Sequence, residues 1–328
     1  MHLIEHFDLR HHNTLGLPAR ARFGGLIHTL EDLAAGLAAA QSKGLPFHLL
    51  GGGSNCVLGQ EIEAVIGVMA MRGRSIESSD PDSVKITAKA GESWPDLVEW
   101  TVAQGIGGLE NLSGIPGTVG AAPVQNIGAY GREISQFVER VIAHDTRDHC
   151  MRTFRGNECA FRYRNSRFKD EPGRYLITEV VLALPRAWQA HLSYAGLGEL
   201  GVGCTPQQVS AAVLQLRASK LPDWRKTGNA GSFFHNPVVP QERRTSLEGV
   251  PFHIVDDGLK LSAGWLLEAC GLKGYRLGGA GFSEKHALVL VNHGGADFSD
   301  VKALADEARR RVAERFGVHL VQEPVTLT

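Results

Sequence analysis

Apolar residues recur with helical spacing in several segments of the chain. In residues 30–43, Leu30, Leu33 and Leu37 fall on one helix face, and Thr29 with Asp32 forms a capping-box start. Gly44 supplies the matching stop. The same reasoning predicts further helices at residues 96–104, from 206 through 216 after a Thr205 N-cap, at 262–270 and at 299–316.

Alternating or continuous apolar positions predict strands between these helices. Val84, Ile86 and Ala88 alternate with polar residues, which is typical of a strand with one buried face. Further strands are predicted at residues 47–50, 137–144, 175–184 and 287–292. Because strands and helices alternate without a strict βαβ repeat, we predict an α+β fold. The longest apolar run, residues 64–71, is shorter than the ~20 residues that a membrane helix needs.

Charge and cysteine content narrow the classes of function. The chain has 34 Lys+Arg and 35 Asp+Glu, so its net charge of −1 gives no basic footprint for nucleic acid. Residues 1–13 carry charges where an export signal needs an apolar run, so we expect a cytoplasmic protein. The five cysteines are scattered without a C-x-x-C, and no histidine spacing is typical of a metal ligand set, so neither disulfides nor a metal site is expected.

Glycine is the residue type in excess, at 39 of 328, and it gathers in two nearly uncharged stretches. Residues 51–55, Gly-Gly-Gly-Ser-Asn, follow a predicted strand, and the second stretch spans residues 114–131. Glycines let backbone N–H groups converge on phosphate oxygens, and Ser54, Asn55 and Thr118 add short donors. Together the stretches predict a pyrophosphate cradle for a dinucleotide, with a pair of simple glycine turns as the alternative.

The standard nucleotide-binding fingerprints do not account for these stretches. A G-x-G-x-x-G occurs at Gly196, Gly198 and Gly201, but the next helix cap comes later, at Thr205. No acidic strand end follows about 20 residues on, so we interpret the match as chance. The chain also lacks a G-x-x-x-x-G-K-[ST] sequence, which excludes a P-loop.

Three other segments carry candidate chemistry. Residues 161–169 combine arginines with aromatic residues, a composition that suits a bound anion, a solvated edge strand or, less well, RNA. Ser232 stands between a glycine turn and Phe233-Phe234, a place where a hydroxyl would be held in a dry pocket. Without further context, an ordinary turn hydroxyl is the more common interpretation. Glu323 lies in the apolar stretch 319–325, so it either reaches solvent or meets a cation.

Taken in order, these motifs resemble the UDP-N-acetylenolpyruvoylglucosamine reductase family. The resemblance spans nearly the whole chain and rests on Asn13-Thr14, residues 51–55, 114–131, 163–166 (Tyr-Arg-Asn-Ser), 228–237 and 322–324 (Gln-Glu-Pro). It implies a two-lobed FAD-binding fold of the vanillyl-alcohol-oxidase type, followed by a smaller α+β substrate domain. We expect the FAD-binding lobes at residues 1–65 and 66–200, and the substrate domain at 201–328, with its C-terminal segment returning to the active site.

The resemblance also implies an activity and the residues that perform it. Members of the family use NADPH and non-covalent FAD to reduce UDP-N-acetylglucosamine enolpyruvate to UDP-N-acetylmuramate for peptidoglycan, the cell-wall polymer on which cell shape and division depend. Ser232 resembles the proton donor, and Arg164 and Glu323 resemble the pair that stabilises the enol form of the substrate carboxylate. The implied FAD contacts are Gly51, Gly52, Gly53, Ser54, Asn55, Ser113, Gly117, Thr118, Gly120, Gln125, Asn126, Ile127, Gly128, Tyr130 and Gly131.

Substrate contacts follow from the same resemblance. Tyr163, Lys220 and Asn236 match residues that contact the nucleotide sugar, and Tyr194, in residues 190–197, resembles the lid tyrosine of one subtype. We expect a monomer without nucleic-acid or membrane partners. Two alternatives remain: another flavin oxidase or dehydrogenase on the same fold, and a nucleotide-sugar-binding module without catalysis.

Overall fold

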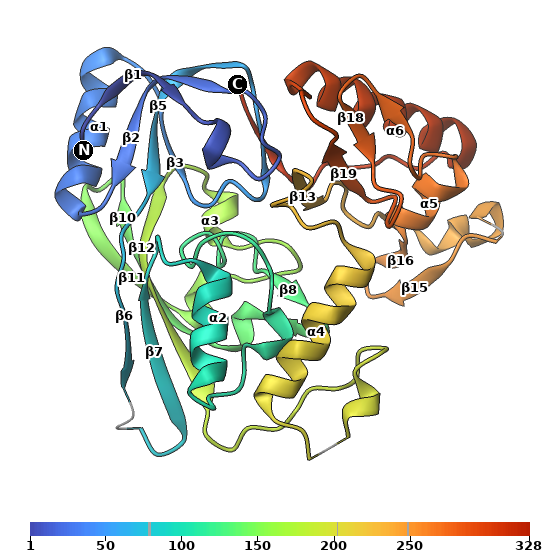
Figure 1. The fold of residues 1–328 in the computed structure, drawn as a ribbon, viewed down its shortest axis with the longest axis horizontal. Coiled ribbons are helices and arrows are strands. Elements are labelled where there is room, and N and C mark those ends of the chain that lie inside the picture. Colours follow the sequence, from blue (N-terminus) through green and yellow to red (C-terminus); the bar gives the residue numbers. More distant parts are fainter. Residues whose placement is uncertain (78–79, 202, 248) are drawn as a thin grey trace. The chain divides into compact units, whose positions relative to one another are not determined.

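The computed structural model describes residues 1–77, 80–201, 203–247 and 249–328 (Figure 1). Contacts divide the chain into two compact units, each made of separate stretches of sequence. Unit 1 comprises Met1–Phe7, Arg22–Gly52 and Ala64–Arg217, and unit 2 comprises Asp8–Ala21, Gly53–Glu63 and Ala218–Thr328. The three contiguous domains predicted from the sequence, 1–65, 66–200 and 201–328, are a different kind of division and remain a prediction.

The largest sheet of unit 1 is antiparallel and has the strand order β11-β10-β12-β7-β6. Helix α2 (Trp94–Ala103) packs against it, because Trp94 and Leu97 share a buried core with Ile86 of β7 and Leu182 of β12. The strands are β6 (Arg74–Glu77), β7 (Ser83–Lys89), β10 (Val138–Asp145), β11 (Cys150–Arg155) and β12 (Tyr175–Pro185). Apolar side chains at alternate positions of β7 supply one buried face, as predicted.

A second sheet, with order β1-β2-β5-β3, has most of its residues in unit 1. Its strands are β1 (Ile4–Asp8), β2 (Arg20–Ile27), β5 (Glu61–Met69) and β3 (Phe47–Leu50). Helix α1 (Leu30–Lys43) precedes β3 and has both predicted ends: Thr29 and Asp32 form the capping box, and Gly44 is left-handed at φ 64°. Strand β3 pairs in parallel with β5, so the chain that leaves β3 enters the glycine stretch at Gly51.

Unit 2 is built on the sheet β13-β19-β18-β17, which shares a core with helices α5 and α6. These elements are β13 (Asn229–Ser232), β17 (Arg276–Leu277), β18 (Ala280–Phe282), β19 (Val289–Asn292), α5 (Ala263–Ala269) and α6 (Phe298–Phe316). A small sheet joins β14 (Val238–Val239), β15 (Phe252–Val255) and β16 (Gly258–Leu261), and β20 (Val325–Leu327) pairs in parallel with β4 (Cys56–Leu58). Short 3-10 helices are η1 (Arg10–His12), η2 (Glu110–Leu112), η3 (Ile134–Gln136), η4 (Gly156–Cys159), η5 (Gly198–Leu200) and η6 (Gln241–Leu247).

Local capping explains where the predicted helices begin. α4 (Pro206–Lys220) starts as predicted, because the Thr205 amide donates to Gln208 Oε1 and the Gln208 amide donates to Thr205 Oγ1. α2 begins two residues earlier than predicted, since Ser93 rather than a later residue caps it. Residues 196–201 contain only η5, so the G-x-G-x-x-G opens no α-helix.

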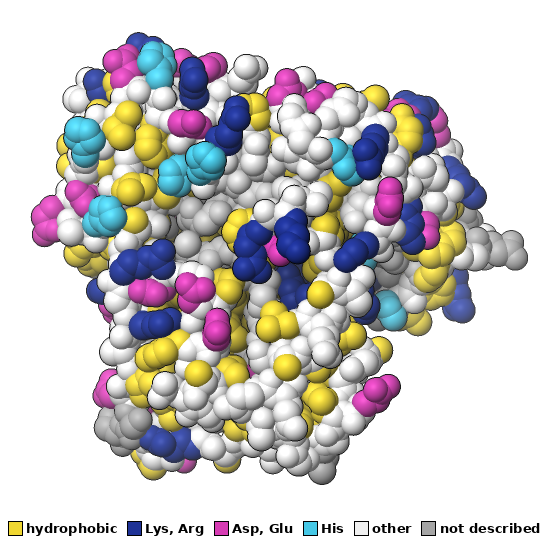
Figure 2. All heavy atoms as spheres, viewed as in Figure 1, with side chains coloured by type: hydrophobic (Ala, Val, Ile, Leu, Met, Phe, Trp, Pro, Cys, Tyr) yellow, Lys and Arg dark blue, Asp and Glu magenta, His cyan; other side chains and the backbone are white. Residues whose placement is uncertain are grey.

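The surface and the described side chains add three findings. Lys/Arg and Asp/Glu side chains are interspersed over the face visible in Figure 2. None of the helices in the described residues is long and apolar enough to cross a membrane. Within the same residues, all five cysteines are free, and no cluster of three His, Cys, Asp or Glu side chains could hold a metal ion.

Candidate active site

The two glycine-rich stretches meet inside unit 1. A Cβ atom built on Gly51 would lie 2.6 Å from Thr118 Oγ1, and one on Gly52 would lie 2.8 Å from the Cα of Gly117. Carbon atoms do not approach other atoms this closely, so any side chain at position 51 or 52 would push the stretches apart. The predicted association of the two stretches is therefore confirmed, while their role toward a cofactor stays a prediction.

A buried hydroxyl at this contact has no protein partner. Thr118 Oγ1 makes no hydrogen bond to any described residue, although it is shielded from solvent. Leaving such a group unsatisfied costs about 1–3 kcal/mol, so native proteins rarely do so without a ligand or water to bond it. The residues present therefore fit a polar group, such as a dinucleotide phosphate, bound against Thr118.

Backbone strain marks the end of the second stretch. Asn126 and Tyr130 have φ angles of 46° and 50°, values that non-glycine residues seldom adopt. The Asn126 side chain holds this conformation, since its Nδ2 donates to Glu133 Oε2 at 2.7 Å and to the Arg162 carbonyl at 3.1 Å. The hairpin of β8 (Gly128–Ala129) and β9 (Arg132–Glu133) follows. Asn126, predicted as an FAD contact, thus has a clear structural role through its side chain.

Arg164 lies against the same loop. Its NH2 donates to the Gly128 carbonyl at 2.7 Å, and its NH1 lies 3.5 Å from the Asn126 carbonyl. Its backbone is left-handed, with φ 53°, and Lys169 Nζ donates to the Arg164 carbonyl at 3.1 Å. The structure therefore brings the arginine-rich segment and the glycine loop together, and it orients the guanidinium before any substrate binds.

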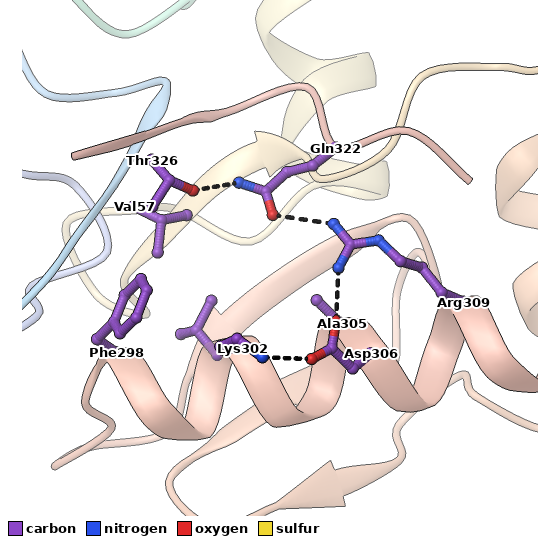
Figure 3. Close-up of a pocket in the computed structure, with 9 residues that line it drawn as sticks. Val57, Phe298, Lys302, Ala305, Asp306, Arg309, Gln322 and Thr326 are labelled. Carbon is purple, nitrogen blue, oxygen red and sulfur yellow. Dashed lines mark hydrogen bonds and ion pairs between the residues drawn. The ribbon is translucent and has the colours of Figure 1, made fainter. Parts of the chain in front are cut away.

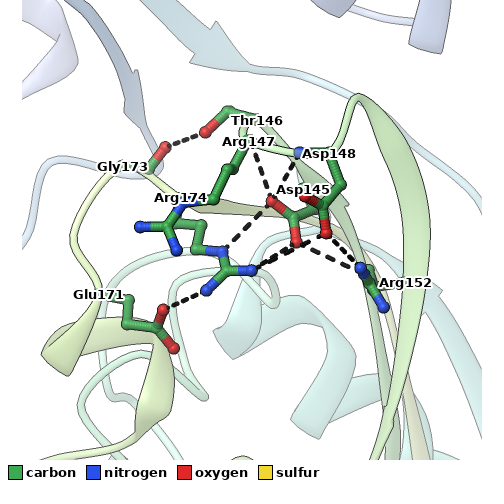
Figure 4. A network of polar contacts seen from close by, with 8 residues as sticks. All are labelled: Asp145, Thr146, Arg147, Asp148, Arg152, Glu171, Gly173 and Arg174. Atoms are coloured by element: carbon green, nitrogen blue, oxygen red, sulfur yellow. Dashed lines mark hydrogen bonds and ion pairs between the residues drawn. The ribbon is translucent and has the colours of Figure 1, made fainter.

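A buried acid, Asp145, binds Arg174, which in turn binds Glu171 on the segment after Arg164 (Figure 4). The Asp145 side chain is 0% exposed and accepts bonds from Arg174 Nε and NH2 at 3.3 and 3.2 Å. Burial alone raises the pKa of Asp145, but the hydrogen bonds from Arg174 and from the Arg147 and Asp148 amides outweigh it and lower that pKa to about 2. Arg174 NH1 also donates to Glu171, which ends α3 (Arg167–Asp170), the helix that carries Lys169.

The predicted lid loop packs on the glycine loop within unit 1. The rings of Tyr194 and Tyr130 meet edge to face, with centroids 4.8 Å apart. Asn111 Nδ2 donates to the carbonyls of Tyr130 and His191 at 2.9 and 3.0 Å, so one side chain joins the two loops. The closeness of the loops fits a lid, and their motion remains a prediction.

Arg217 is a candidate site residue that the sequence analysis missed. It lies on α4 beside Gly114, where a built Cβ would be 3.1 Å from its Nε. Burial lowers the pKa of Arg217, with Tyr130 acting in the opposite direction, and no carboxylate in the described part of the chain pairs with it. The sequence pattern could have pointed to it, because Ser210, Leu214 and Arg217 share one helix face. In the structure that face meets the start of the second glycine stretch, where Ser210 Oγ bonds Ser113 Oγ at 2.8 Å.

In unit 2 the segment that carries Glu323 runs beside the residues that follow Ser232 at the end of β13. Phe234 and Gln322 form an antiparallel bridge, the His235 amide donates to the Val321 carbonyl at 2.9 Å, and the Glu323 amide donates to the Phe233 carbonyl at 3.0 Å. The dry pocket expected for Ser232 is wrong. Phe233 and Phe234 enter the core, each 1% exposed, while Ser232 at the end of β13 stays exposed.

Thr14 and the C-terminal segment connect this strand pair to the end of the first glycine stretch. Thr14 donates its amide to the Gly53 carbonyl at 3.0 Å and its hydroxyl to the Asn229 carbonyl at 2.6 Å. The Val325 amide donates to the Asn55 carbonyl at 3.0 Å. Within unit 2, therefore, the segment after Gly53 and the strands that carry Ser232 and Glu323 form one hydrogen-bonded assembly.

His235 is the second residue that the sequence analysis missed. Its Nδ1 lies 3.7 Å from Glu323 Oε2, and the Glu323 side chain is only 13% exposed. Of the two environments predicted for Glu323, solvent or a cation, the structure favours a basic partner. Asn236, the next residue, accepts a bond from the Ala263 amide at the start of α5.

The predicted site residues divide between the two units. Of the catalytic candidates, Arg164 lies in unit 1, and Ser232 and Glu323 lie in unit 2. Of the substrate contacts, Tyr163 and Tyr194 lie in unit 1, and Lys220 and Asn236 in unit 2. Of the FAD contacts, Gly53, Ser54 and Asn55 lie in unit 2, and unit 1 holds Gly51, Gly52, Ser113, Gly117, Thr118, Gly120, Gln125, Asn126, Ile127, Gly128, Tyr130 and Gly131.

Comparisons with known proteins match the chain along its length. A model of the UDP-N-acetylenolpyruvoylglucosamine reductase C-terminal domain matches residues 223–327, and an FAD binding domain model matches residues 26–145. The UDP-N-acetylenolpyruvoylglucosamine reductase of Pseudomonas aeruginosa is 44% identical over 99% of this chain and 98% of its own length. This chain belongs to the UDP-N-acetylenolpyruvoylglucosamine reductase family.

Other members of the reductase family agree in extent and in fold. The protein of that name from Alcanivorax borkumensis is 46% identical over 99% of this chain and 96% of its own length. The crystal structure of the reductase from Thermus caldophilus matches with a TM-score of 0.70 and 26% identity, covering 99% of this chain and 98% of that one. The predicted family and the predicted α+β fold, with an FAD-binding part and a smaller C-terminal domain, are confirmed. The tyrosine-lid subtype and the roles of single residues stay predictions.

Proposed function

We propose that this chain reduces UDP-N-acetylglucosamine enolpyruvate to UDP-N-acetylmuramate, with NADPH as the hydride source and non-covalent FAD as the carrier. The observation that supports this most is the assembly in unit 2, where the segment after Gly53 is bonded to the strands of Ser232 and Glu323. A flavin reductase needs its cofactor-binding segment and its acid–base groups in one site. We also propose that the protein works in the cytoplasm, as a monomer, in peptidoglycan precursor synthesis.

The residues present fit FAD. The backbone around Gly52 and Gly117 is bare of side chains, the buried Thr118 hydroxyl lacks a protein partner, and Arg217 adds a cation without a carboxylate partner in the described part of the chain. Backbone N–H groups, a short hydroxyl and a guanidinium are the groups that hold a pyrophosphate. Bound FAD would supply hydride transfer between NADPH and the enolpyruvyl methylene carbon, chemistry that no side chain provides.

The chain's own residues would then manage charge and a proton. Hydride addition to the methylene carbon leaves negative charge on the adjoining carbon and its carboxylate. We assign the Arg164 guanidinium and the Glu323 carboxyl to that carboxylate, where a cation and a shared proton stabilise the enol form as it develops. Ser232 would protonate the carbon, and since a serine hydroxyl is a weak acid, its position must account for most of its effect.

Separate measurement of the two half-reactions tests this proposal. In an anaerobic stopped-flow experiment, NADPH first bleaches the flavin absorbance, and UDP-N-acetylglucosamine enolpyruvate then restores it. We expect Ser232→Ala to keep the first rate and to slow the second at least about 10²-fold, the lower range for loss of a general acid. Ser42→Ala is the matched control, because its exposed hydroxyl bonds the Ala39 carbonyl within α1.

The outcomes separate the alternatives. Equal slowing of both half-reactions by Ser232→Ala would remove the serine from the proton-donor role. A yellow protein that NADPH bleaches but the enolpyruvyl substrate never reoxidises would be a different flavin enzyme on the same fold. A colourless protein that binds the nucleotide sugar would be a binding module.

A further inference from the structure

Arg309 contacts both residues of the isolated bridge between the chain that follows Ser232 and the segment that carries Glu323. On α6, its guanidinium carbon lies 5.6 Å from the centroid of the Phe234 ring, and its NH2 lies 3.3 Å from Gln322 Oε1. Phe234 and Gln322 are the two residues of that bridge. One side chain therefore contacts each partner of the bridge at once. Figure 3 shows its bond to Gln322.

Gln322 extends this contact along the C-terminal segment. Its Nε2 donates to the Pro324 carbonyl at 2.8 Å and to Thr326 Oγ1 at 3.0 Å, while its Oε1 accepts from Arg309. These bonds span Glu323 from both sides in sequence, so the amide fixes the backbone on which the Glu323 carboxyl is mounted.

Ordinary surface pairing accounts for only part of the arrangement. Arg309 NH1 donates to Asp306 Oδ1 at 2.7 Å, and Asp306 also pairs with Lys302 at 2.8 Å, so the acid keeps a cation without Arg309. The contacts to Gln322 and Phe234 have no such substitute in the described residues. A planar guanidinium can stack on a ring and donate from its edge simultaneously, which an ammonium group cannot do as well.

We infer that Arg309 is a positioning residue that holds the strand of Ser232 in register with the segment of Glu323. It touches neither substrate nor cofactor and acts through Phe234 and Gln322. The inference rests on the proposed function, because it matters for catalysis only if Ser232 and Glu323 act on the substrate. Small errors in the placement of such groups are costly: a 1 Å misplacement can slow a reaction about 10²-fold.

Variants of the FAD-loaded protein test the inference. We expect Arg309→Gln to slow reoxidation of the reduced flavin by the enolpyruvyl substrate about tenfold through kcat rather than KM. Reduction by NADPH should stay within about twofold, since neither Ser232 nor Glu323 has a proposed role in that half-reaction. Arg309→Lys should recover part of the rate. Arg310→Gln is the matched control, because Arg310 on the same helix pairs, among the described residues, with Glu307 and Glu314.

Amide hydrogen exchange supplies a readout that is independent of activity. Deuterium uptake by peptides covering residues 320–328 should rise in Arg309→Gln and stay unchanged in Arg310→Gln, since the Glu323 and Val325 amides are bonded in the native pairing. Gln322→Met removes the acceptor of the same Arg309–Gln322 bond. It replaces Arg309→Gln in both measurements if that variant does not fold. Matching behaviour of the Arg309 and Arg310 variants in both measurements would overturn the inference.

Different results distinguish failure of the proposed function from failure of the inference about Arg309. If Ser232→Ala and Glu323→Gln leave reoxidation unchanged, both the proposed roles and the inference are wrong. If those variants slow reoxidation but Arg309→Gln and Gln322→Met do not, only the inference is wrong.

Discussion

Each unit has a cluster of acid and arginine side chains near a segment that carries a candidate catalytic residue. The acids of the two clusters differ in burial. In unit 1, Asp145 is 0% exposed and forms ion pairs with Arg174 and Arg152 (Figure 4). In unit 2, Asp306 is 49% exposed and forms ion pairs with Lys302 and Arg309 (Figure 3). The chemical groups are nearly the same, so the difference in solvent access decides what each cluster contributes.

Because Asp145 is buried, we expect its cluster to contribute mainly to the stability of unit 1. Asp306 is exposed, so we expect the main contribution of its cluster to be the positioning role of Arg309. The Asp145 carboxylate is 0% exposed and accepts from Arg174 and from the Arg147 and Asp148 amides, so an amide in its place would lose buried acceptor capacity that water cannot replace. An exposed pair loses little, because water and salt replace the partner. We therefore expect Asp145 to contribute strongly to the stability of its unit, whereas Asp306 contributes little to stability and the contacts of Arg309 with Gln322 and Phe234 matter more than its pairing with Asp306.

The largest expected effect is that of Asp145→Asn. We expect the free energy of unfolding to fall by about 3 kcal/mol, as for other broken buried ion pairs, measured by urea denaturation followed by circular dichroism. Asp148→Asn is the matched control, because Asp148 pairs with Arg152 at the same turn but is 40% exposed. A similar small loss in both variants would contradict the contrast drawn from burial.

Sequence reasoning succeeded where the deciding contacts are local. Both ends of α1 were predicted, because Thr29, Asp32 and Gly44 act within one turn of the helix. The glycine stretches were recognised from composition, and the predicted association of the two is confirmed by the close approach of Gly52 to Gly117. The family resemblance then added candidate roles that composition alone could not give.

The residues that were missed depend on partners distant in sequence. His235 has no metal-type spacing, and its interest comes only from Glu323, which the strand pairing at Phe234 and Gln322 brings near. The dry pocket expected for Ser232 was wrong because both following phenylalanines are buried and the serine is left at the strand end. Pairings between segments this far apart are set by tertiary packing, which no local pattern records.

Acid titration should sharpen the contrast at Asp145. Its folded pKa of about 2 lies below the ~3.9 of an unfolded aspartate, so its stabilisation is complete above about pH 4 and is lost as pH falls through 2. The stability difference between wild type and Asp145→Asn should therefore be constant from pH 7 to about 5 and shrink between about 4 and 2. Urea midpoints at each pH measure it, and a difference that persists unchanged at pH 2 would contradict the pairing.

The smallest expected effect is that of Asp306→Asn. Its pKa is lowered by hydrogen bonds from Lys302 and Arg309, but the carboxylate is half exposed, so solvent screening reduces what that shift contributes to stability. We expect a loss of less than about 1 kcal/mol, and less still in high salt. Flavin reoxidation should stay near the wild-type rate, because Arg309 keeps Gln322 and Phe234 without its acid. A slow Asp306→Asn variant with normal stability would mean that Asp306 orients Arg309, and the positioning role would then belong to the pair.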